Sequence, residues 1–152
     1  MLLNKGDQAP EFSLPDSHGN IVSLSDFKGK KVVLWFFPKA STPGWTIEGQ
    51  VFRDEYKNFN GKNTIIIGIS ADSIKTQKNF CTKQRFPFSL LSDPEKVTIK
   101  AYKAYGMKKF MGKEYQGIYR ISYLIDENGI IEKAYEKVKP KEHAIKVLED
   151  IG

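Results

Sequence analysis

An apolar run leads directly into a helix start in residues 32–48, which read Val32-Val33-Leu34-Trp35-Phe36-Phe37-Pro38-Lys39-Ala40-Ser41-Thr42-Pro43-Gly44-Trp45-Thr46-Ile47-Glu48. The run 32–37 has the length of a strand and is apolar on both faces, which is typical of a central strand covered by helices on both sides. Thr42 suits a helix N-cap, and Pro43 suits the first helical position. We therefore predict a helix over residues 43–59, which Asn60-Gly61 ends.

A second β-branched run, residues 64–70, follows this helix. A strand, a helix and a strand at this spacing predict a unit with two parallel strands. The remaining pattern predicts a strand at 89–91, helices over 73–85, 95–104 and 141–151, and hairpins formed by 12–14 with 21–24 and by 121–125 with 130–135. The order resembles an α/β thioredoxin-like fold, with a central mixed sheet flanked by helices and an N-terminal β-hairpin extension. We expect residues 1–152 to form one such domain.

Composition excludes several other classes of protein. The chain has 152 residues, of which 40% are hydrophobic and 28% charged, an ordinary balance for a soluble domain. No apolar run approaches the ~20 residues of a membrane span, and the N-terminus turns polar too early for a signal peptide. We therefore expect a cytoplasmic protein with no membrane partner. The net charge of +6 leaves a nucleic-acid surface as an alternative. Lysine dominates over arginine and does not alternate with aromatic residues, so we expect a solvated surface and no nucleic-acid partner.

The metal-binding and disulfide-forming residues are few. Cys81 is the only cysteine, so the chain has no internal disulfide and no cysteine-based metal site. His18 falls in a predicted turn and His143 on the predicted C-terminal helix. We expect both to be exposed surface residues rather than ligands, and we expect no metal.

Position 45 lies in the first turn of the predicted helix. Unpaired backbone N–H groups and the positive end of the helix dipole are directed there. A thiolate at this place would be stabilised, and its pKa lowered. The indole of Trp45 cannot attack as a nucleophile and donates only through its N–H.

The residues around position 45 carry a family resemblance. The pattern Pro38-x-x-x-Thr42-x-x-Trp45 resembles the peroxiredoxin signature, with tryptophan where that family has its nucleophilic cysteine. A longer match resembles the bacterioferritin-comigratory-protein branch, also called Q-type. It comprises Phe37-Pro38-Lys39, Thr42-Pro43-Gly44, Thr46-x-Glu48, Phe52-Arg53-Asp54, Phe86-Pro87-Phe88, Leu90-Leu91-Ser92-Asp93, Tyr105-Gly106 and Ile118-x-Arg120.

The resemblance implies a role for each matching residue. Position 45 would carry the peroxidatic cysteine, which becomes sulfenic acid when it attacks a peroxide. Thr42 would hydrogen-bond the nucleophile and the peroxide, while Arg120 would hold the thiolate and stabilise charge on the departing oxygen. Pro38 would shield the pocket from water, and the N–H groups of residues 44 and 45 would bind peroxide oxygen. The supporting residues would be Pro43, Gly44, Glu48 and Arg53.

The resemblance also implies where the resolving thiol lies. One subgroup of the family has a second cysteine five residues after the first, but here that position is Gln50. Another subgroup places it on the helix after the next strand, as Cys81 is placed, 36 residues beyond position 45. Cys81 therefore resembles the resolving thiol. The alternative is that Cys81 is a small, buried apolar residue.

Taken together, the resemblance implies an atypical two-cysteine peroxiredoxin that reduces hydrogen peroxide and organic hydroperoxides, with electrons from thioredoxin or a similar dithiol protein. It implies no metal, haem or flavin, and a monomer. With Trp45 the chain should lack turnover. Trp45 is an engineered replacement, a natural one or a sequencing error, and a natural one would indicate a non-catalytic binding or chaperone-like protein. Because an indole overpacks a pocket sized for a thiol by ~1–3 kcal/mol, we expect the first helical turn to be displaced and the ring to lie outside.

Overall fold

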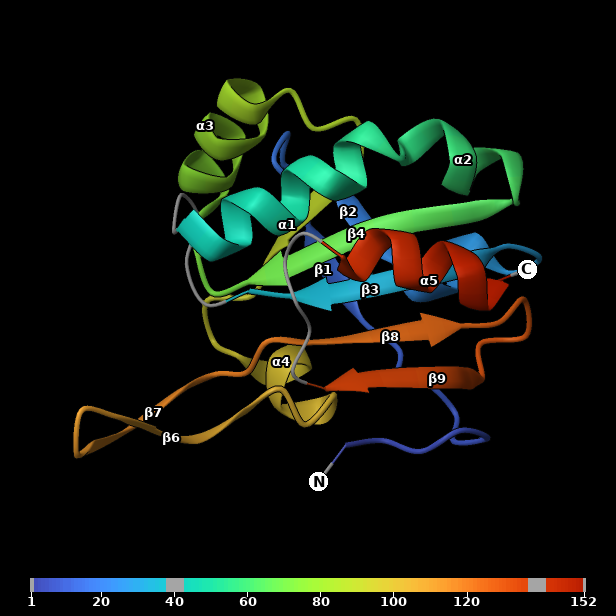
Figure 1. Cartoon of the computed structure of the whole chain (residues 1–152). Coiled ribbons are helices and arrows are strands. Elements are labelled where there is room, and N and C mark those ends of the chain that lie inside the picture. Colours follow the sequence, from blue (N-terminus) through green and yellow to red (C-terminus); the bar gives the residue numbers. More distant parts are fainter. Residues whose placement is uncertain (1, 38–42, 137–141, 152) are drawn as a thin grey trace.

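A five-stranded mixed sheet forms the centre of the computed structural model, and helices cover both of its faces (Figure 1). The structure describes residues 2–37, 43–136 and 142–151, with the backbone alone for residues 43–45, 48 and 110. In the sheet the strand order is β5-β4-β3-β8-β9. Strands β3, β4 and β5 run parallel, whereas β8 and β9 are antiparallel to their neighbours.

The elements follow one another along the chain with short connections. The strands are β1 (Ser13–Pro15), β2 (Ile21–Ser23), β3 (Lys31–Phe36), β4 (Thr64–Ser70), β5 (Ser89–Ser92), β6 (Tyr105–Phe110), β7 (Lys113–Ile118), β8 (Ile121–Ile125) and β9 (Ile131–Glu136). The helices are the 3₁₀ turn η1 (Leu24–Phe27), α1 (Pro43–Asp54), α2 (Tyr56–Gly61), α3 (Ile74–Gln84), α4 (Val97–Ala101) and α5 (His143–Ile151).

Strand β3 is buried on both faces, as its continuous apolar run predicts. Val32, Leu34 and Phe36 belong to one core cluster, which the N-terminal segment, η1 and α4 cover. The side chains that alternate with them, such as Trp35, belong to a second cluster under α1, α2, α3 and α5. Because β3 has no solvent-exposed face, it fixes the sheet at the centre of three layers. The predicted α/β thioredoxin-like fold is confirmed.

Two predicted helices differ in extent from the structure. The helix expected over 43–59 is divided into α1 and α2, because Glu55 leaves helical geometry with φ −96° and ψ 4°. Phe52 of α1 and Phe59 of α2 still contact each other in the core, with ring centroids 5.8 Å apart. The helix expected over 95–104 is only the short α4. None of the helices in the described part of the chain is long and apolar enough to cross a bilayer.

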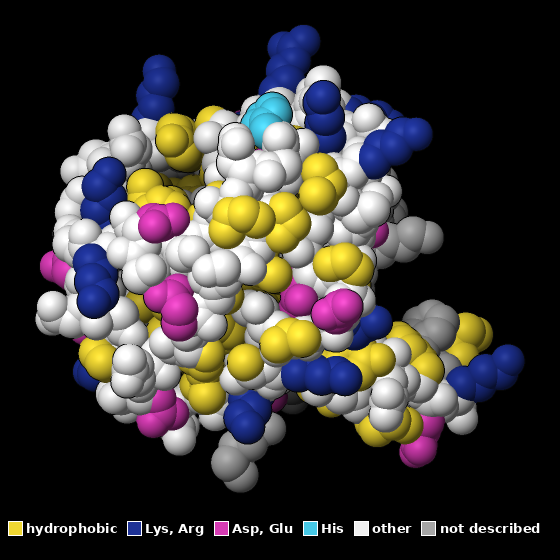
Figure 2. Space-filling model, turned by 180° about the vertical axis from the view of Figure 1, so that it is seen from behind, with side chains coloured by type: hydrophobic (Ala, Val, Ile, Leu, Met, Phe, Trp, Pro, Cys, Tyr) yellow, Lys and Arg dark blue, Asp and Glu magenta, His cyan; other side chains and the backbone are white. Residues whose placement is uncertain are grey.

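The sequence did not lead us to expect the hairpin β6–β7. It projects from the body of the molecule, with apolar and lysine side chains along it (Figures 1 and 2). Its two-residue turn is Met111-Gly112, and both residues have positive φ, at 51° and 80°. Turns of this kind match the twist of a hairpin but favour Asn-Gly or Asp-Gly. Met111 is 87% exposed at the tip.

The expected exposure of His143 is wrong. The side chain is buried and packs edge-on against the rings of Phe52, at 5.6 Å, and Tyr135, at 5.0 Å. His143 lies four residues before Val147, so it shares the stripe of α5 that faces the sheet. Ile145 of the same helix is 47% exposed. His18 is exposed, as expected.

Candidate active site

The start of α1 and Arg120 lie at the same end of the central sheet. Strand β3 ends at Phe36, and α1 begins at Pro43 beyond that end (Figure 1). In the antiparallel register of β3 and β8, Trp35 is opposite Ser122. Arg120, two residues before Ser122, is therefore level with Phe37, the residue that follows β3. The N-terminus of α1, with its free N–H groups, and Arg120 thus lie at the same end of the sheet, and a helix N-terminus together with a cation would stabilise an anion there.

The structure describes only some of the predicted site residues. Pro38 and Thr42 lie outside the described residues, and the side chains of Trp45 and Glu48 are not described. The backbone of α1 is helical from Pro43, so our expectation of a displaced first turn is wrong, whereas the expected position of the indole ring concerns a side chain outside the described residues. Pro43 favours this start, since its ring presets φ near the helical value and its missing N–H is not needed at the first position.

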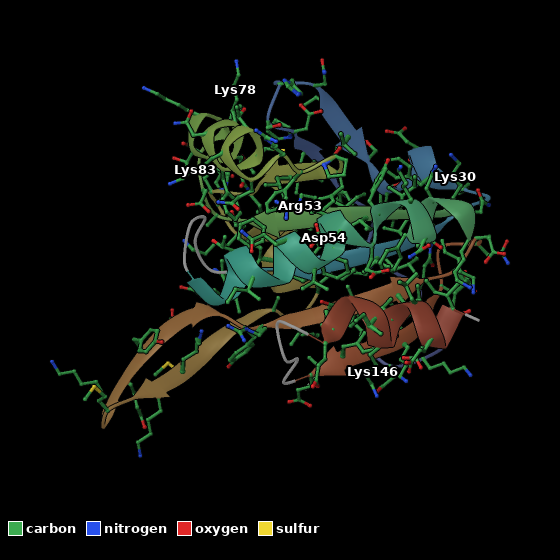
Figure 3. The ribbon with its side chains drawn as sticks, turned by 45° about the horizontal axis from the view of Figure 1, so that its top comes forward. Lys30, Arg53, Asp54, Lys78, Lys83 and Lys146 are labelled. Carbon is green, nitrogen blue, oxygen red and sulfur yellow. The ribbon has the colours of Figure 1, made fainter. Side chains whose placement is uncertain are left out.

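The second half of α1 is held against α3 and the segment that follows it. Gln50 Nε2 donates to Gln84 Oε1 at 2.8 Å. Arg53, on the side of α1 that faces α3 (Figure 3), donates from Nη1 to the carbonyl oxygen of Gln84, also at 2.8 Å. Gly49 lies against the ring of Phe86, where a Cβ atom would approach Cζ to 2.5 Å. Arg53 therefore joins α1 to α3, and it lies about three helical turns from the start of α1.

Cys81 lies on α3 and is half-buried. Its Sγ atom is 3.6 Å from the carbonyl oxygen of Phe86 and 3.8 Å from that of Phe88. Burial raises the pKa of the thiol, and the carboxylate of Asp16 raises it further. A hydrogen bond from Ser17 lowers the pKa and so partly offsets the effect of burial. The thiol therefore favours its protonated, less nucleophilic form.

A pocket of about 300 Å³ opens beside this thiol. Its lining combines cationic and hydroxyl side chains around Cys81 and consists of Ser17, His18, Lys78, Thr82, Arg85 and Phe86. Ser17 and His18, from the turn between β1 and β2, lie more than sixty residues before Cys81 in the sequence. No local sequence pattern connects them to Cys81. In the part of the chain that the structure describes, no group of three or more His, Cys, Asp or Glu side chains is placed to hold a metal ion.

Comparison with known proteins identifies the family. The family model described as AhpC/TSA matches residues 5–134. The chain belongs to the Bcp/PrxQ peroxiredoxins of this family. It is 42% identical to "Peroxiredoxin Bcp" of Bacillus subtilis over 151 residues, which cover 99% of the chain and 96% of the relative. It is 43% identical to a "Putative peroxiredoxin bcp" of Haemophilus influenzae, with 93% and 91% covered.

Solved Bcp/PrxQ structures share the whole architecture. A mutant of PrxQ from Xylella fastidiosa superimposes with a TM-score of 0.93 at 33% identity, covering 99% of the chain and 96% of that protein. Peroxiredoxin Q from Xanthomonas campestris gives a TM-score of 0.87 at 36% identity, covering 92% and 89%. Both likenesses extend across the sheet and its flanking helices, so the fold and the family agree.

Proposed function

We propose that this chain carries the site of a thiol-dependent peroxidase whose nucleophile position is occupied by Trp45. The observation that carries the proposal is the shared end of the sheet, where α1 begins beyond β3 and the register of β3 and β8 brings Arg120 level with Phe37, the residue after β3. A thiolate at position 45 would gain both the helix N-terminus and the guanidinium. Tryptophan gains neither, so the chain as it stands does not turn over peroxide.

The proposed reaction with a thiol at position 45 has three steps. The thiolate attacks one peroxide oxygen, the O–O bond breaks, and the departing oxygen leaves as water or an alcohol after taking a proton. The sulfenic acid then condenses with the thiol of Cys81, which forms a disulfide and releases water. A dithiol protein such as thioredoxin reduces this disulfide by exchange and becomes oxidised itself.

The role of Cys81 has support from a relative. Two structures of the Xanthomonas campestris protein are cysteine-to-serine variants, at positions 36 residues apart. Positions 45 and 81 of this chain have the same separation.

A disulfide needs Cα atoms within ~7 Å. Because α1 starts as a regular helix, we expect its first turn to open during the second step while Gln50 and Arg53 hold the rest of α1 on Gln84.

The Trp45→Cys variant tests the proposal directly. We expect it to consume hydrogen peroxide and an organic hydroperoxide in the presence of thioredoxin, its reductase and NADPH, whereas Trp45→Ser and the unmodified chain remain inactive. Adding Cys81→Ser to Trp45→Cys should leave a sulfenic acid that dimedone traps, and should prevent the internal disulfide. A folded Trp45→Cys protein that neither consumes peroxide nor forms sulfenic acid would overturn the enzymatic assignment and favour the non-catalytic alternative.

A further inference from the structure

One segment of the chain has a net charge almost as large as that of the whole chain. Residues 94–125 contain seven Lys or Arg and two Glu, a net charge of +5, whereas the whole chain has +6. This segment includes α4, the hairpin β6–β7 and Arg120. At the base of the hairpin, the Nζ atoms of Lys96 and Lys100 lie 5.8 and 5.3 Å from the ring centroid of Tyr105. The base of the hairpin adjoins the end of the sheet where β8 begins (Figure 1).

One cation of this segment, Lys108, is held in a defined place. Gly106 and Gly117 face each other directly in the register of β6 and β7. The absence of a side chain at Gly117 leaves room for the stem of Lys108, since a Cβ atom there would lie 3.0 Å from Lys108 Cδ. Lys108 Nζ donates to the carbonyl oxygen of Ile118 at 3.0 Å. The ammonium group is therefore fixed at the end of β7, two residues before Arg120.

The adjacent lysine has a different environment. Lys109 pairs in register with Glu114, and residues that face each other in an antiparallel pair point to the same side. Glu114 therefore lies on the same face of the hairpin as Lys109, and Lys108 lies on the other face. None of the ion pairs among the described residues involves Lys108. Its positive charge is thus not neutralised by the acid of its own hairpin.

Lys108 and Arg120 also influence each other. Burial first, and then the positive charge of Arg120, lower the pKa of the Lys108 ammonium group. Two like charges held near each other raise the local electrostatic potential, and an anion close to both relieves their repulsion. A thiolate at the start of α1 would be such an anion.

We propose that Lys108 is a positioning residue of the peroxidase site, which acts together with Arg120 to lower the pKa of a thiol at position 45. This inference rests on the proposed function. Lys108 does not itself need to touch the peroxide. It supplies a second positive charge, held at Ile118 two residues before Arg120, and so favours the reactive thiolate at neutral pH.

The test measures the pKa of the introduced thiol, from the pH dependence of its alkylation rate. The parent is Trp45→Cys with Cys81→Ser, which carries a single thiol. We expect Lys108→Met to raise that pKa by about half a unit to one unit, because the thiolate loses the attraction of one positive charge at intermediate dielectric. Lys109→Met, the matched control, should leave it unchanged, and Lys108→Arg should restore the parent value because it keeps the charge.

Two further measurements separate the possible outcomes. Gly117→Ala displaces the stem of Lys108 without removing its charge, so it should raise the thiol pKa in the same direction by less. If Lys108→Met is folded and leaves the thiol pKa unchanged while Trp45→Cys is an active peroxidase, the role of Lys108 is refuted and the proposed function stands. If Trp45→Cys is inactive and its thiol has an ordinary pKa, the proposed function itself fails.

Discussion

The thiol of Cys81 is the only one in the chain, so its titration can be followed without ambiguity. Because burial raises its pKa, we expect alkylation by iodoacetamide to keep accelerating above the pH at which an ordinary cysteine is fully reactive. Asp16→Asn removes a nearby negative charge and should lower the pKa, whereas Ser17→Ala removes a hydrogen bond to the thiolate and should raise it. Equal alkylation profiles for all three proteins would contradict this account of the pocket.

His143 makes the stability of the fold depend on pH. Burial lowers the pKa of this imidazole from 6.5 to about 4, while Asp150 opposes the shift and Lys146 adds to it. The unfolded chain therefore binds a proton at a higher pH than the folded chain does. The contribution of neutral His143 to the free energy of unfolding is therefore fully present above about pH 6.5. It is lost as the pH decreases toward 4, which lowers the free energy of unfolding by up to about 3 kcal/mol.

Urea unfolding between pH 4 and pH 7 measures this dependence. In His143→Leu the free energy of unfolding should decrease less between pH 7 and pH 4 than in the parent chain, whatever its value at pH 7. The control is His18→Gln, at an exposed position, which should keep the decline of the parent chain. An equally steep decline in His143→Leu would assign it to other groups.

At the scale of elements, the sequence predicts the central strands better than the site. Strands β3 and β4 are continuous apolar runs, a pattern that fits a sheet covered on both faces. The hairpin β8–β9 follows from Asn128-Gly129. The hairpin β6–β7 was missed because Met111 occupies a turn position that usually carries Asn or Asp. The neighbours of Cys81 and the placement of Lys108 were missed because they depend on tertiary contacts and cross-strand register, which no local pattern encodes.

The packing of α1 on the segment after α3 depends on one missing side chain. A Cβ atom at Gly49 would lie 2.5 Å from the nearly buried ring of Phe86, so we expect Gly49→Ala to lower the free energy of unfolding by about 1–3 kcal/mol. Gly61→Ala is the matched control, because a Cβ atom there meets no atom within 4 Å. In the last turn of α2 it should be neutral or stabilising by up to about 1 kcal/mol. Urea unfolding should show a loss of stability for Gly49→Ala and none for Gly61→Ala, and a neutral Gly49→Ala would contradict the close packing of Gly49 on Phe86.

At the scale of the whole molecule, the hairpin β6–β7 is set apart from the body. Its strands pair only with each other, whereas β3, β4 and β8 each have neighbours on both sides in the large sheet. An isolated two-stranded hairpin is marginally stable in water. The base of the hairpin β6–β7 is held by two hydrogen bonds from Tyr119. Its N–H donates to the carbonyl oxygen of Ala104 at 2.7 Å, and its hydroxyl donates to the carbonyl oxygen of Met107 at 2.9 Å.

Amide hydrogen exchange should therefore show a gradient across the molecule. We expect the amides of β3, β4 and β8 to exchange only through global unfolding, those near the tip of β6–β7 to exchange through local opening, and those at its base to fall between. The hairpin β8–β9, also antiparallel, is the internal control because it lies within the large sheet. Equal protection of β6–β7 and β8–β9 would require a surface that covers the projecting hairpin. Repeating the experiment at two protein concentrations would show whether a second copy of the chain supplies that surface, because protection by association rises with concentration.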